Sequence, residues 1–490
     1  MTALSEETGD RPLPEMTAIG RAAPALVPLA VGGVLYLVML ISGDQLLNDP
    51  DSYSHIVVGR WMVEHRAFPT ADPFSFTFAG SPWIAKEWLS QILYAGAHAA
   101  SGWPGMVVLA AAAVALAFAL LARFLIDDLR PLYAVLFVAG AFLLAAPHVT
   151  ARPHALAFPV MVAWVAGLVR AADEKRAPSL WLLPLMVVWA NLHGGFTFGI
   201  MMVGALGLDA IVASPAETRL RTAARWIGFG LLALAAGCVT PYGWQSVLMT
   251  VRILGLGPAL SIIGEWKPAD FSHLSGLEIV LLIGLGAALW RGVTLAPVRI
   301  VILLGLVHMA LSATRNAEVF GLVAPLIIAR PLARQVAYLR AKPHGNADLG
   351  TFSGALAALL IALVPLTVAL SAALHYAPNA RITPAAAVAA LTAAAPGPLL
   401  NQYDFGGYLV YQGLPTFIDG RTELYGGAFF ARYYNAVTLA DLAGFDRLLD
   451  EYQIKATLLA PDTPAVAWLD RLPGWHRLYA DTIAVVHVRN

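Results

Sequence analysis

Long apolar runs separated by short polar breaks dominate the first three quarters of the chain. A helix needs about 20 predominantly apolar residues to cross a hydrocarbon core of about 30 Å. On this basis the sequence predicts about eleven membrane spans, two of them short. Several are rich in Ala and Gly, which suits close packing of helices in lipid. The predicted spans cover residues 25–42, 103–125, 131–147, 153–171, 178–192, 194–213, 226–240, 274–290, 297–313, 317–330 and 353–375.

The pattern changes after the last predicted span, where short alternations of apolar and polar residues replace the long runs. KATLLAP at 455–461 is typical of a strand, and WHRLYADTIAVVHV at 475–488 is typical of a hairpin. FDRLLDEYQI at 445–454 and AVAWLDRL at 465–472 have helical spacing. We therefore predict a small α/β domain over 377–490. The predicted fold class is a polytopic α-helical membrane protein with a C-terminal extracytoplasmic α/β domain.

Composition supports the membrane assignment and excludes one class of partner. Of 490 residues, 59% are hydrophobic and 13% are charged, whereas soluble proteins carry about 25% charged residues. Lys+Arg and Asp+Glu both number 31, so the net charge is zero. A nucleic-acid partner would require a basic face, and we do not expect one. Cys238 is the only cysteine, so an intramolecular disulfide cannot form.

Positive charge is distributed unevenly between the two predicted membrane faces. If the N-terminal tail (1–24) is cytoplasmic, the inside loops carry about sixteen Lys and Arg and the outside loops about seven, as the positive-inside rule predicts. The transmembrane region is predicted at 25–376, with a first external loop at 43–102. Pro343–Gly350 is then a cytoplasmic loop. An odd number of spans places the C-terminal domain outside.

Polar side chains collect in the loops of the predicted outer face, whereas the inner loops contain mainly Arg, Ala and Pro. Ionisable groups at a membrane edge are costly and usually line a pathway or a site. We therefore predict that the functional face is extracytoplasmic. The outer-loop segments with this composition are DPDSYSH, KEW, PHVTARPH, NLHGG, TPYGW, GEWKP and ATRN.

Asp49 and Asp51 directly follow the first predicted span. A carboxylate at this position could act as a general base on a hydroxyl, or the two together could hold a divalent cation. The structural alternative is that Asp49 caps a helix beginning near Ser52 and that Asp51 favours its positive end. Spacing alone does not separate these alternatives, so the catalytic assignment and any metal stay open.

The next segment, SYSHIVVGRWMVEH, has the pattern of an amphipathic helix. It places Ile56, Val57, Trp61 and Val63 on an apolar side and His55, Arg60, Glu64 and His65 on a more polar side. A helix lying flat in the membrane interface fits this pattern. The alternative is a loop helix packed under the C-terminal domain.

The remaining candidate substrate-binding residues are spread over the outer loops and the C-terminal domain. Lys86 and Glu87 could bind a phosphate or a sugar hydroxyl, or could serve a helix N-terminus and the lipid interface. Arg152 lies at the outer edge of a span and needs a partner there, such as a phosphate, a lipid headgroup or Asp49. The full set is His55, Lys86, Glu87, Arg152, His154, His193, Glu265, Lys267, Arg315 and Arg421.

Several of these features also have purely structural interpretations. His193, in NLHGG, could stabilise a tight turn. The Trp residues of KEW and GEWKP could anchor the interface or stack on a sugar ring. Asp72, before a proline, is typical of a hydrogen-bonded turn. Asp419 and Arg421 could form a local ion pair.

Taken together, these segments resemble the GT-C superfamily of membrane glycosyltransferases. Within it they are most similar to bacterial members described as dolichyl-phosphate-mannose mannosyltransferase-like or RgtA/B/C/D-like. The segments that carry the resemblance touch most of the chain, but each is short and none is diagnostic of a particular sugar. They are NDPDSYSHIVVGRW, TADPFSFTFAGSPWIAKEWLSQ, NLHGG, TPYGW, and YDFGGYL followed by FIDGRTELYGG.

The resemblance implies transfer of a sugar from a polyprenyl-phosphate carrier to an acceptor outside the membrane, usually with inversion. The acceptor would be an envelope lipid, a polysaccharide or a protein, and the location a bacterial inner membrane with the C-terminal domain in the periplasm. In such enzymes an acidic residue of the first external loop lies near the acceptor hydroxyl. That role falls on Asp51 or Asp49, which here are separated by Pro50 and are not an adjacent pair.

The residues themselves agree with a lipid-linked donor. The chain has no G-x-G-x-x-G or Walker signature, so an activated sugar would arrive on lipid. A lipid phosphate leaving group needs cations at the membrane edge, and Lys86, Arg152, His193 and Arg315 are candidates to supply them. Two alternatives stay open, a transporter or flippase of a lipid-linked saccharide and a non-catalytic envelope assembly protein.

Overall fold

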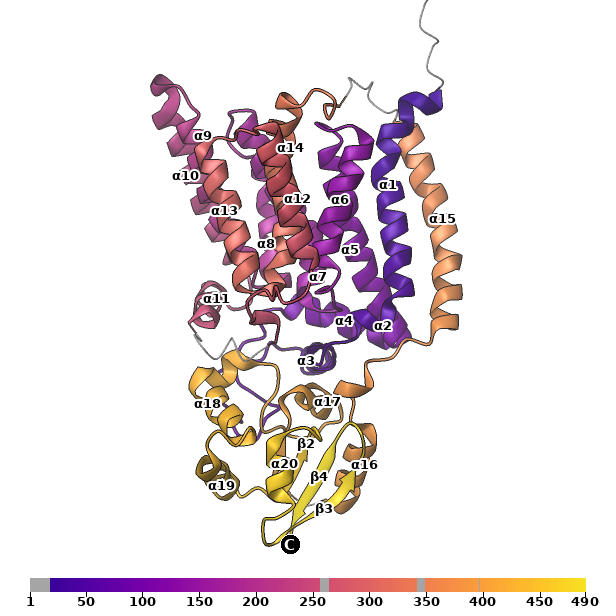
Figure 1. Cartoon of the computed structure of the whole chain (residues 1–490), viewed down its shortest axis with the longest axis vertical. Coiled ribbons are helices and arrows are strands. Elements are labelled where there is room, and N and C mark those ends of the chain that lie inside the picture. Colours follow the sequence, from indigo (N-terminus) through magenta and orange to yellow (C-terminus); the bar gives the residue numbers. More distant parts are fainter. Residues whose placement is uncertain (1–17, 256–263, 342–348, 396) are drawn as a thin grey trace, which may run out of the picture.

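A computed structural model of the chain describes residues 18–255, 264–341, 349–395 and 397–490. It consists of a bundle of long helices and a smaller α/β domain at one end of that bundle (Figure 1). Each predicted span falls on a helix of the bundle. These helices are α1 (Ala18–Ile41), α5 (Trp103–Leu125), α6 (Pro131–Ala145), α7 (Pro153–Asp173), α8 (Leu183–Leu192), α9 (Phe196–Val212), α10 (Ala216–Gly237), α12 (Gly276–Arg291), α13 (Pro297–Ser312), α14 (Ala317–Gln335) and α15 (Leu349–Leu374).

Four helical stretches are long and apolar enough to cross a membrane by length and composition, namely Trp103–Leu125, Pro153–Asp173, Thr314–Gln335 and Phe352–Leu374. Other apolar helices of the bundle are shorter, so the total number of spans stays a prediction. Helix α1 begins before the predicted start at residue 25. Residues 1–17 of the predicted N-terminal tail and 343–348 of the predicted cytoplasmic loop lie outside the described residues.

The bundle is held together by close apolar packing, as its composition predicts. Phe118, Trp164 and Trp189 are fully or almost fully buried. Glycine allows one close approach, because a Cβ atom on Gly199 would lie 2.4 Å from the Trp189 ring. Helix α15 lies at the outside of the bundle beside α1 (Figure 1), and a hydrogen bond of 2.9 Å joins Tyr36 Oη and Thr367 Oγ1. The short helices between spans are η1 (Leu180–Leu182), α11 (Gln245–Leu254), η3 (Gly264–Trp266) and η4 (Thr314–Asn316).

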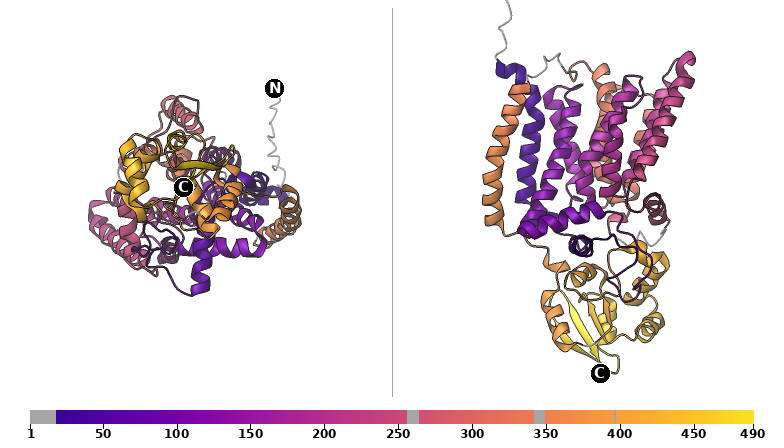
Figure 2. Two further views of the ribbon diagram at one scale, coloured as in Figure 1. Left: turned by 90° about the horizontal axis from the view of Figure 1, so that it is seen from below. Right: turned by 180° about the vertical axis from the view of Figure 1, so that it is seen from behind.

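The first external loop contains three helices, α2 (Gly43–Leu46), α3 (Asp51–His65) and α4 (Trp88–Ser101). Helix α3 lies between the bundle and the C-terminal domain (Figure 2), as the alternative of a helix packed under that domain predicts. The prediction of a helix lying flat in the interface is wrong about which residues of α3 are buried and which are exposed. His55 is 8% exposed although we expected it on a polar side, and Val63 is 60% exposed. The reason is that α4 packs against the side of α3 that carries His55, whose Nδ1 lies 3.4 Å from Gln91 Nε2.

The C-terminal domain has a four-stranded sheet in the order β1-β2-β4-β3. Strands β1 and β2 pair in parallel, and the other pairs are antiparallel. The predicted strand at KATLLAP, the helices on either side of it and the C-terminal hairpin are all present. The strands are β1 (Leu399–Asn401), β2 (Ala456–Leu459), β3 (Trp475–Ala480) and β4 (Val485–Arg489), and the helices are η5 (Ala380–Ile382), α16 (Ala385–Ala394), η6 (Tyr403–Phe405), α17 (Gly406–Tyr411), α18 (Thr422–Val437), α19 (Leu442–Glu451) and α20 (Pro464–Leu469).

The first external loop is joined to this domain by backbone pairing. Ser75 forms an isolated parallel bridge with Thr416, whose carbonyl accepts the N–H of Phe76 at 3.1 Å. The rings of Phe76 and Phe78 pack against the buried cluster of the domain that contains Phe417. The loop and the domain therefore share one apolar core.

Arg421 joins the same two parts electrostatically. Its guanidinium donates to both oxygens of Asp419, at 2.8 and 2.7 Å, and to Asp72 of the loop at 2.5 Å. The cation also lies over the rings of Phe74 and Trp83, with distances of 5.1 and 4.8 Å to the ring centroids. Both carboxylates are fully buried, with 0% of each side chain exposed. Arg421 thus compensates two charges that have lost their water.

We expect Arg421→Met to destabilise the protein by about 3–5 kcal/mol, because it leaves Asp72 and Asp419 buried without a counter-charge. The matched control is Arg432→Met, which breaks the exposed pair with Glu451 and should cost about 0–1 kcal/mol. Thermal unfolding of the purified full-length protein in detergent measures both changes. Equal midpoints for the two variants would contradict the assignment.

Candidate functional site

Arg152 is the centre of a cluster of charged residues at the end of the bundle that faces the C-terminal domain. The residue has extended backbone and precedes the first turn of α7. Its Nη1 donates to Asp49 Oδ2 at 3.2 Å and to Glu265 Oε2 at 2.9 Å, and its Nη2 donates to Asp51 Oδ2 at 2.8 Å. One cation therefore joins three carboxylates from two distant loops. The predicted need of Arg152 for a partner is met by Asp49 together with two further acids.

Local backbone structure fixes the members of this cluster. Asp49 Oδ1 accepts the N–H of Asp51 at 2.9 Å, which is the side-chain turn expected of Asp before a helix. Helix α3 begins at Asp51, one residue before the predicted start. The carbonyl of Arg152 accepts a hydrogen bond from Tyr94 Oη at 3.0 Å, and Leu46 O accepts the N–H of Ala151 at 2.6 Å. The loop that carries Arg152 is thereby fastened to the first external loop.

Arg315 extends the cluster toward η4. Its Nη1 donates to Glu265 Oε1 at 2.6 Å, so Glu265 bridges two arginines. The Arg315 guanidinium also lies 4.8 Å from the centroid of the Trp266 ring. Of the five N–H donors on a guanidinium, this pairing uses one, which leaves donors for an anionic ligand.

The pKa values of the three carboxylates differ, because burial raises each pKa and the neighbouring arginines lower it to a different extent. Burial raises the pKa of Asp51 to about 7, and the neighbouring charge of Asp49 adds to this effect, while Arg152 opposes it. Burial likewise raises the pKa of Asp49 by more than Arg152 lowers it. Burial also acts to raise the pKa of Glu265, but Arg152 and Arg315 outweigh it and hold the pKa below its ordinary value. Asp51 can therefore change its protonation state near neutral pH.

The C-terminal domain approaches Asp51 very closely. A Cβ atom on Gly420 would lie 1.7 Å from Asp51 Oδ1, so only glycine fits there. Gly407 is similarly placed, because its Cβ atom would lie 2.1 Å from the carbonyl oxygen of Pro50. The glycines of the domain thus allow its backbone to cover the start of α3.

A cavity of about 160 Å³ adjoins the cluster. Two of the residues that line it, His154 and Glu318, each have a buried polar atom that forms no hydrogen bond among the described residues. These atoms, His154 Nε2 and Glu318 Oε2, lie 3.8 Å apart. The lining residues are Asp49, Pro147, His148, Thr150, His154, Glu265, Arg315 and Glu318.

Two histidines continue from this cavity toward α4. The rings of His154 and His193 lie 6.3 Å apart, and His193 Nε2 lies 3.6 Å from Glu87 Oε1. Burial, assisted by Arg315 and Lys86, lowers the pKa of His193 to about 3. Burial thus disfavours the cationic form that we predicted, and a role of His193 at a substrate stays a prediction. Its Nδ1 accepts the N–H of Gly195 at 3.1 Å, which is the predicted turn contact.

The remaining candidates lie at differing distances from the cluster. Burial lowers the pKa of His55 to about 3, and its Nδ1 lies 3.4 Å from Gln91 Nε2. Lys86 Nζ donates to Glu423 Oε1 of α18 at 2.9 Å, so it joins the bundle end to the C-terminal domain. Lys267 is exposed.

Arg421 does not extend toward the cavity. It is 8% exposed and its guanidinium is bonded to Asp72 and Asp419. Binding of substrate by Arg421 would require these bonds to break, so the predicted substrate contact is replaced by the local ion pair. Asp72 likewise forms the predicted turn, with its carboxylate accepting the N–H of Phe74 at 2.9 Å and of Ser75 at 3.1 Å.

A divalent cation does not fit the cluster. The guanidinium of Arg152 already lies among Asp49, Asp51 and Glu265 and is bonded to all three. Its charge would repel a metal ion placed between them. Across the residues that the structure describes, no group of three or more His, Cys, Asp or Glu side chains is arranged to hold a metal ion.

Three residues of this region were not predicted from the sequence. Glu318 had a signal, because an acid at the start of an apolar span is unusual. Glu423 and Gly420 had none, since their partners Lys86 and Asp51 lie more than 300 residues away in sequence. Only the tertiary structure brings them to the cluster.

Comparison with solved structures identifies a similar fold. The crystal structure of the apo form of the oligosaccharyltransferase from Archaeoglobus fulgidus aligns with a TM-score of 0.51 and 12% identity, covering 89% of this chain and 69% of that chain. The archaeal oligosaccharyltransferase AglB from the same organism, in complex with an inhibitory peptide and a dolichol-phosphate, aligns with a TM-score of 0.54 and 12% identity, covering 91% and 70%. No protein-family profile and no curated protein sequence matches the chain.

This likeness concerns the fold. The chain, a bundle of long apolar helices followed by a small C-terminal α/β domain, has a fold similar to that of the archaeal oligosaccharyltransferase. The predicted helical bundle and C-terminal α/β domain are confirmed. The GT-C superfamily, its bacterial branch and the number of spans stay predictions.

We expect Arg152→Gln to destabilise the protein by about 3–5 kcal/mol, because Asp49, Asp51 and Glu265 lose their shared counter-charge. The loss should be larger at about pH 8 than at about pH 5, since uncompensated carboxylates have raised pKa values and become neutral as the pH falls. Thermal midpoints of the detergent-purified protein across this range measure the effect.

The matched control for that experiment is Arg447→Gln, which breaks the exposed pair with Asp441. Its free energy of unfolding should differ from that of the wild type by no more than about 1 kcal/mol at every pH, so the two thermal midpoints should stay close. An Arg152→Gln midpoint that stays parallel to the wild type across the pH range would show that the three carboxylates do not depend on Arg152.

Proposed function

We propose that the protein is a membrane glycosyltransferase. It transfers a sugar from a polyprenyl-phosphate-linked donor to an acceptor bound between the bundle and the C-terminal domain. The observation that carries the proposal is the meeting of Asp49, Asp51, Arg152, Glu265 and Arg315 beside a polar cavity at one end of an apolar bundle. The likeness in fold to an oligosaccharyltransferase solved with a dolichol-phosphate supports a lipid-linked donor.

The proposed location is a bacterial inner membrane, with the N-terminus in the cytoplasm and the cluster on the periplasmic side. The division into a transmembrane region at 25–376 and a periplasmic domain at 377–490 belongs to the same proposal. The asymmetry of Lys and Arg between loops supports this orientation. The acceptor is an envelope lipid, a polysaccharide or a protein.

We assign the role of general base to Asp51. Its pKa of about 7 is near the value at which a base is both ionised and able to take a proton at neutral pH. Oδ2 is bonded to Arg152, whereas Oδ1 accepts no hydrogen bond from the described residues. In Asp49 both oxygens are used, one by the N–H of Asp51 and one by Arg152. Asp49 therefore serves mainly to position Asp51 and Arg152.

The proposed reaction is a single displacement at the anomeric carbon. Asp51 takes the proton of the acceptor hydroxyl or amide, and the acceptor atom forms a bond to that carbon as its bond to the phosphate oxygen breaks. The electron pair leaves with the polyprenyl phosphate, which gains negative charge. Arg315 lines the cavity and has free donors for this charge. Attack from the face opposite the leaving group inverts the configuration.

The transporter alternative is less well supported. A transporter needs polar groups near the middle of the membrane. The buried ion pairs of this bundle lie near its two ends instead. One group surrounds Arg152, and the other joins Arg299 of α13 to Asp173 and Asp209, at 2.5 and 2.9 Å, near the opposite ends of α7 and α9.

Mass spectrometry of lipid-linked glycans and envelope glycoconjugates in a deletion strain tests the proposal. We expect a polyprenyl-phosphate sugar to accumulate and an acceptor to lose the mass of one sugar. Wild type should restore both, and Asp51→Asn should restore neither, because an amide cannot take the proton. Asp441→Asn, an exposed acid of the C-terminal domain, is the matched control and should restore both.

The result separates the alternatives. An unchanged glycan profile in the deletion strain would support an assembly protein, and complete glycosylation at the wrong membrane face would support a transporter. Full restoration by Asp51→Asn together with failure of Asp49→Asn would transfer the role of base to Asp49.

The pH dependence of transfer gives a second test of Asp51. Only the ionised carboxylate accepts a proton, so kcat/KM should rise with pH through a midpoint of about 7. Removal of the Arg152 charge should move this midpoint to higher pH, because the ionised form of Asp51 loses its partner. The measurement uses membranes of each variant with the donor and acceptor identified by mass spectrometry. A midpoint that is the same in wild type and Arg152→Gln would exclude Asp51 as the titrating group.

A further inference from the structure

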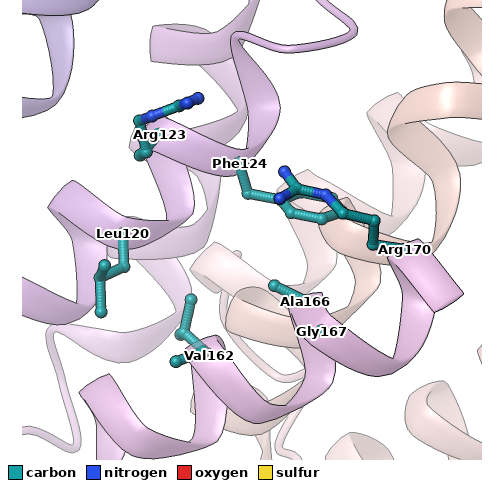
Figure 3. A pocket seen from close by; sticks show the side chains of 8 residues that line it. Leu120, Arg123, Phe124, Val162, Ala166, Gly167 and Arg170 are labelled. Carbon is teal, nitrogen blue, oxygen red and sulfur yellow. The ribbon is translucent and has the colours of Figure 1, made fainter. Parts of the chain in front are cut away.

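A groove with a volume of about 250 Å³ lies between α5 and α7 (Figure 3), at the end of α7 opposite Arg152. Its wall is apolar except for two arginines, one from each helix. The lining residues are Leu120, Arg123, Phe124, Val162, Ala163, Ala166, Gly167 and Arg170. The proposed glycosyl transfer uses none of them.

The groove is at a membrane edge. Both of its helices, α5 and α7, are long and apolar enough to cross a membrane. Arg123 and Arg170 lie in the last turns of these helices. Arg152 stands at the other end of α7, so the groove opens on the opposite side of the membrane, the side predicted to be cytoplasmic.

The two arginines carry more positive charge than their partner neutralises. Arg123 Nη1 and Arg170 Nη2 donate to the two oxygens of Asp127, at 2.5 and 2.6 Å. One carboxylate shared by two guanidinium groups leaves a net charge of +1. The other acids of this region have cations of their own, because Asp128 lies 3.8 Å from Arg330 and Asp173 is bonded to Arg299 at 2.5 Å. Side-chain exposures of 57% for Arg123 and 47% for Arg170 leave donors accessible to a ligand.

Small residues create the apolar part of the groove. Val162, Ala166 and Arg170 follow one another at intervals of four residues and therefore share one face of α7. Ala166 contributes only a methyl group to this face, and a Cβ atom on Gly167 would lie 2.6 Å from Leu182. The distance along α7 from Arg170 to Val162 is about 12 Å at the helical rise. An apolar wall of this length runs from the arginines into the membrane.

We propose that this groove binds one anionic glycerophospholipid. The phosphate lies between the guanidinium groups of Arg123 and Arg170, and one acyl chain lies along Leu120, Val162 and Ala166. Charge complementarity identifies the occupant, because a headgroup with net negative charge matches the +1 site and the ammonium group of a zwitterionic lipid does not. The apolar wall accounts for a lipid in preference to free phosphate, which would leave that wall exposed.

The occupant is bound independently of any transferred sugar. The proposed lipid lies at the opposite end of α7 from Arg152. There it contacts both α5 and α7, next to Asp127, which is bonded to an arginine of each helix. The inference rests on membrane insertion of the bundle and goes beyond the proposed glycosyl transfer.

Native mass spectrometry of the detergent-purified full-length protein tests this inference, with palmitoyl-oleoyl phosphatidylglycerol and phosphatidylcholine as probes. We expect one phosphatidylglycerol to bind about tenfold or more tightly than phosphatidylcholine, a factor that one charge-assisted hydrogen bond supplies. Arg123→Gln with Arg170→Gln should remove this preference. Arg176→Gln, which breaks the exposed pair with Glu174 on the same side of the membrane, should retain it.

A second variant tests the groove without changing its charge. Ala166→Phe fills the apolar wall and should weaken phosphatidylglycerol binding about tenfold or more. Its thermal midpoint in lipid-free detergent confirms that the protein is folded.

Any one of several outcomes would overturn the inference. They are equal binding of the two lipids, unchanged binding by the double arginine variant, unchanged binding by Ala166→Phe, and displacement of phosphatidylglycerol by equimolar inorganic phosphate. Displacement by a lower concentration of a polyprenyl phosphate would assign the groove to that lipid and would equally overturn the choice of a glycerophospholipid.

Discussion

The guanidinium of Arg152 is the interaction on which the domain-facing end of the molecule depends. Three carboxylates that are 14–30% exposed cannot stay close together without a cation, because their mutual repulsion grows as water is removed. A single planar donor with several N–H groups bonds to all three. The first external loop and the segment after α11 are therefore held by the start of α7, and the cavity beside them has a fixed shape.

The C-terminal domain depends on the same loop through different contacts. Gly420 touches Asp51, Arg421 bonds to Asp72, and Glu423 bonds to Lys86. Positions 420, 421 and 423 thus bring one short segment of the domain against three parts of the first external loop. The domain therefore also covers Asp51 and contributes to the burial that raises its pKa. Its desolvating effect on Asp51 requires the absence of a side chain at position 420.

The sequence predicted those features that depend on local pattern. Apolar runs located the helices of the bundle, and the alternation in KATLLAP and in the last hairpin located strands β2, β3 and β4. The cost of an isolated cation at a membrane edge also predicted that Arg152 has a partner. Which carboxylates would pair with it depends on the packing of loops more than 100 residues apart. The burial of His55 and the lowered pKa of His193 depend on neighbours that no local pattern specifies.

The protonation state of Asp51 also depends on the charge of a donor bound beside the cluster. With every group ionised, Asp49, Asp51 and Glu265 contribute three negative charges and Arg152 and Arg315 two positive charges, which leaves −1. An anionic phosphate beside Arg315 raises the pKa of Asp51 further, because like charges favour the neutral acid. The bound donor therefore makes Asp51 a stronger base. When the proton reaches Asp51, the cluster becomes neutral as the phosphate gains negative charge. The electrostatic repulsion that opposes bond cleavage is therefore smaller.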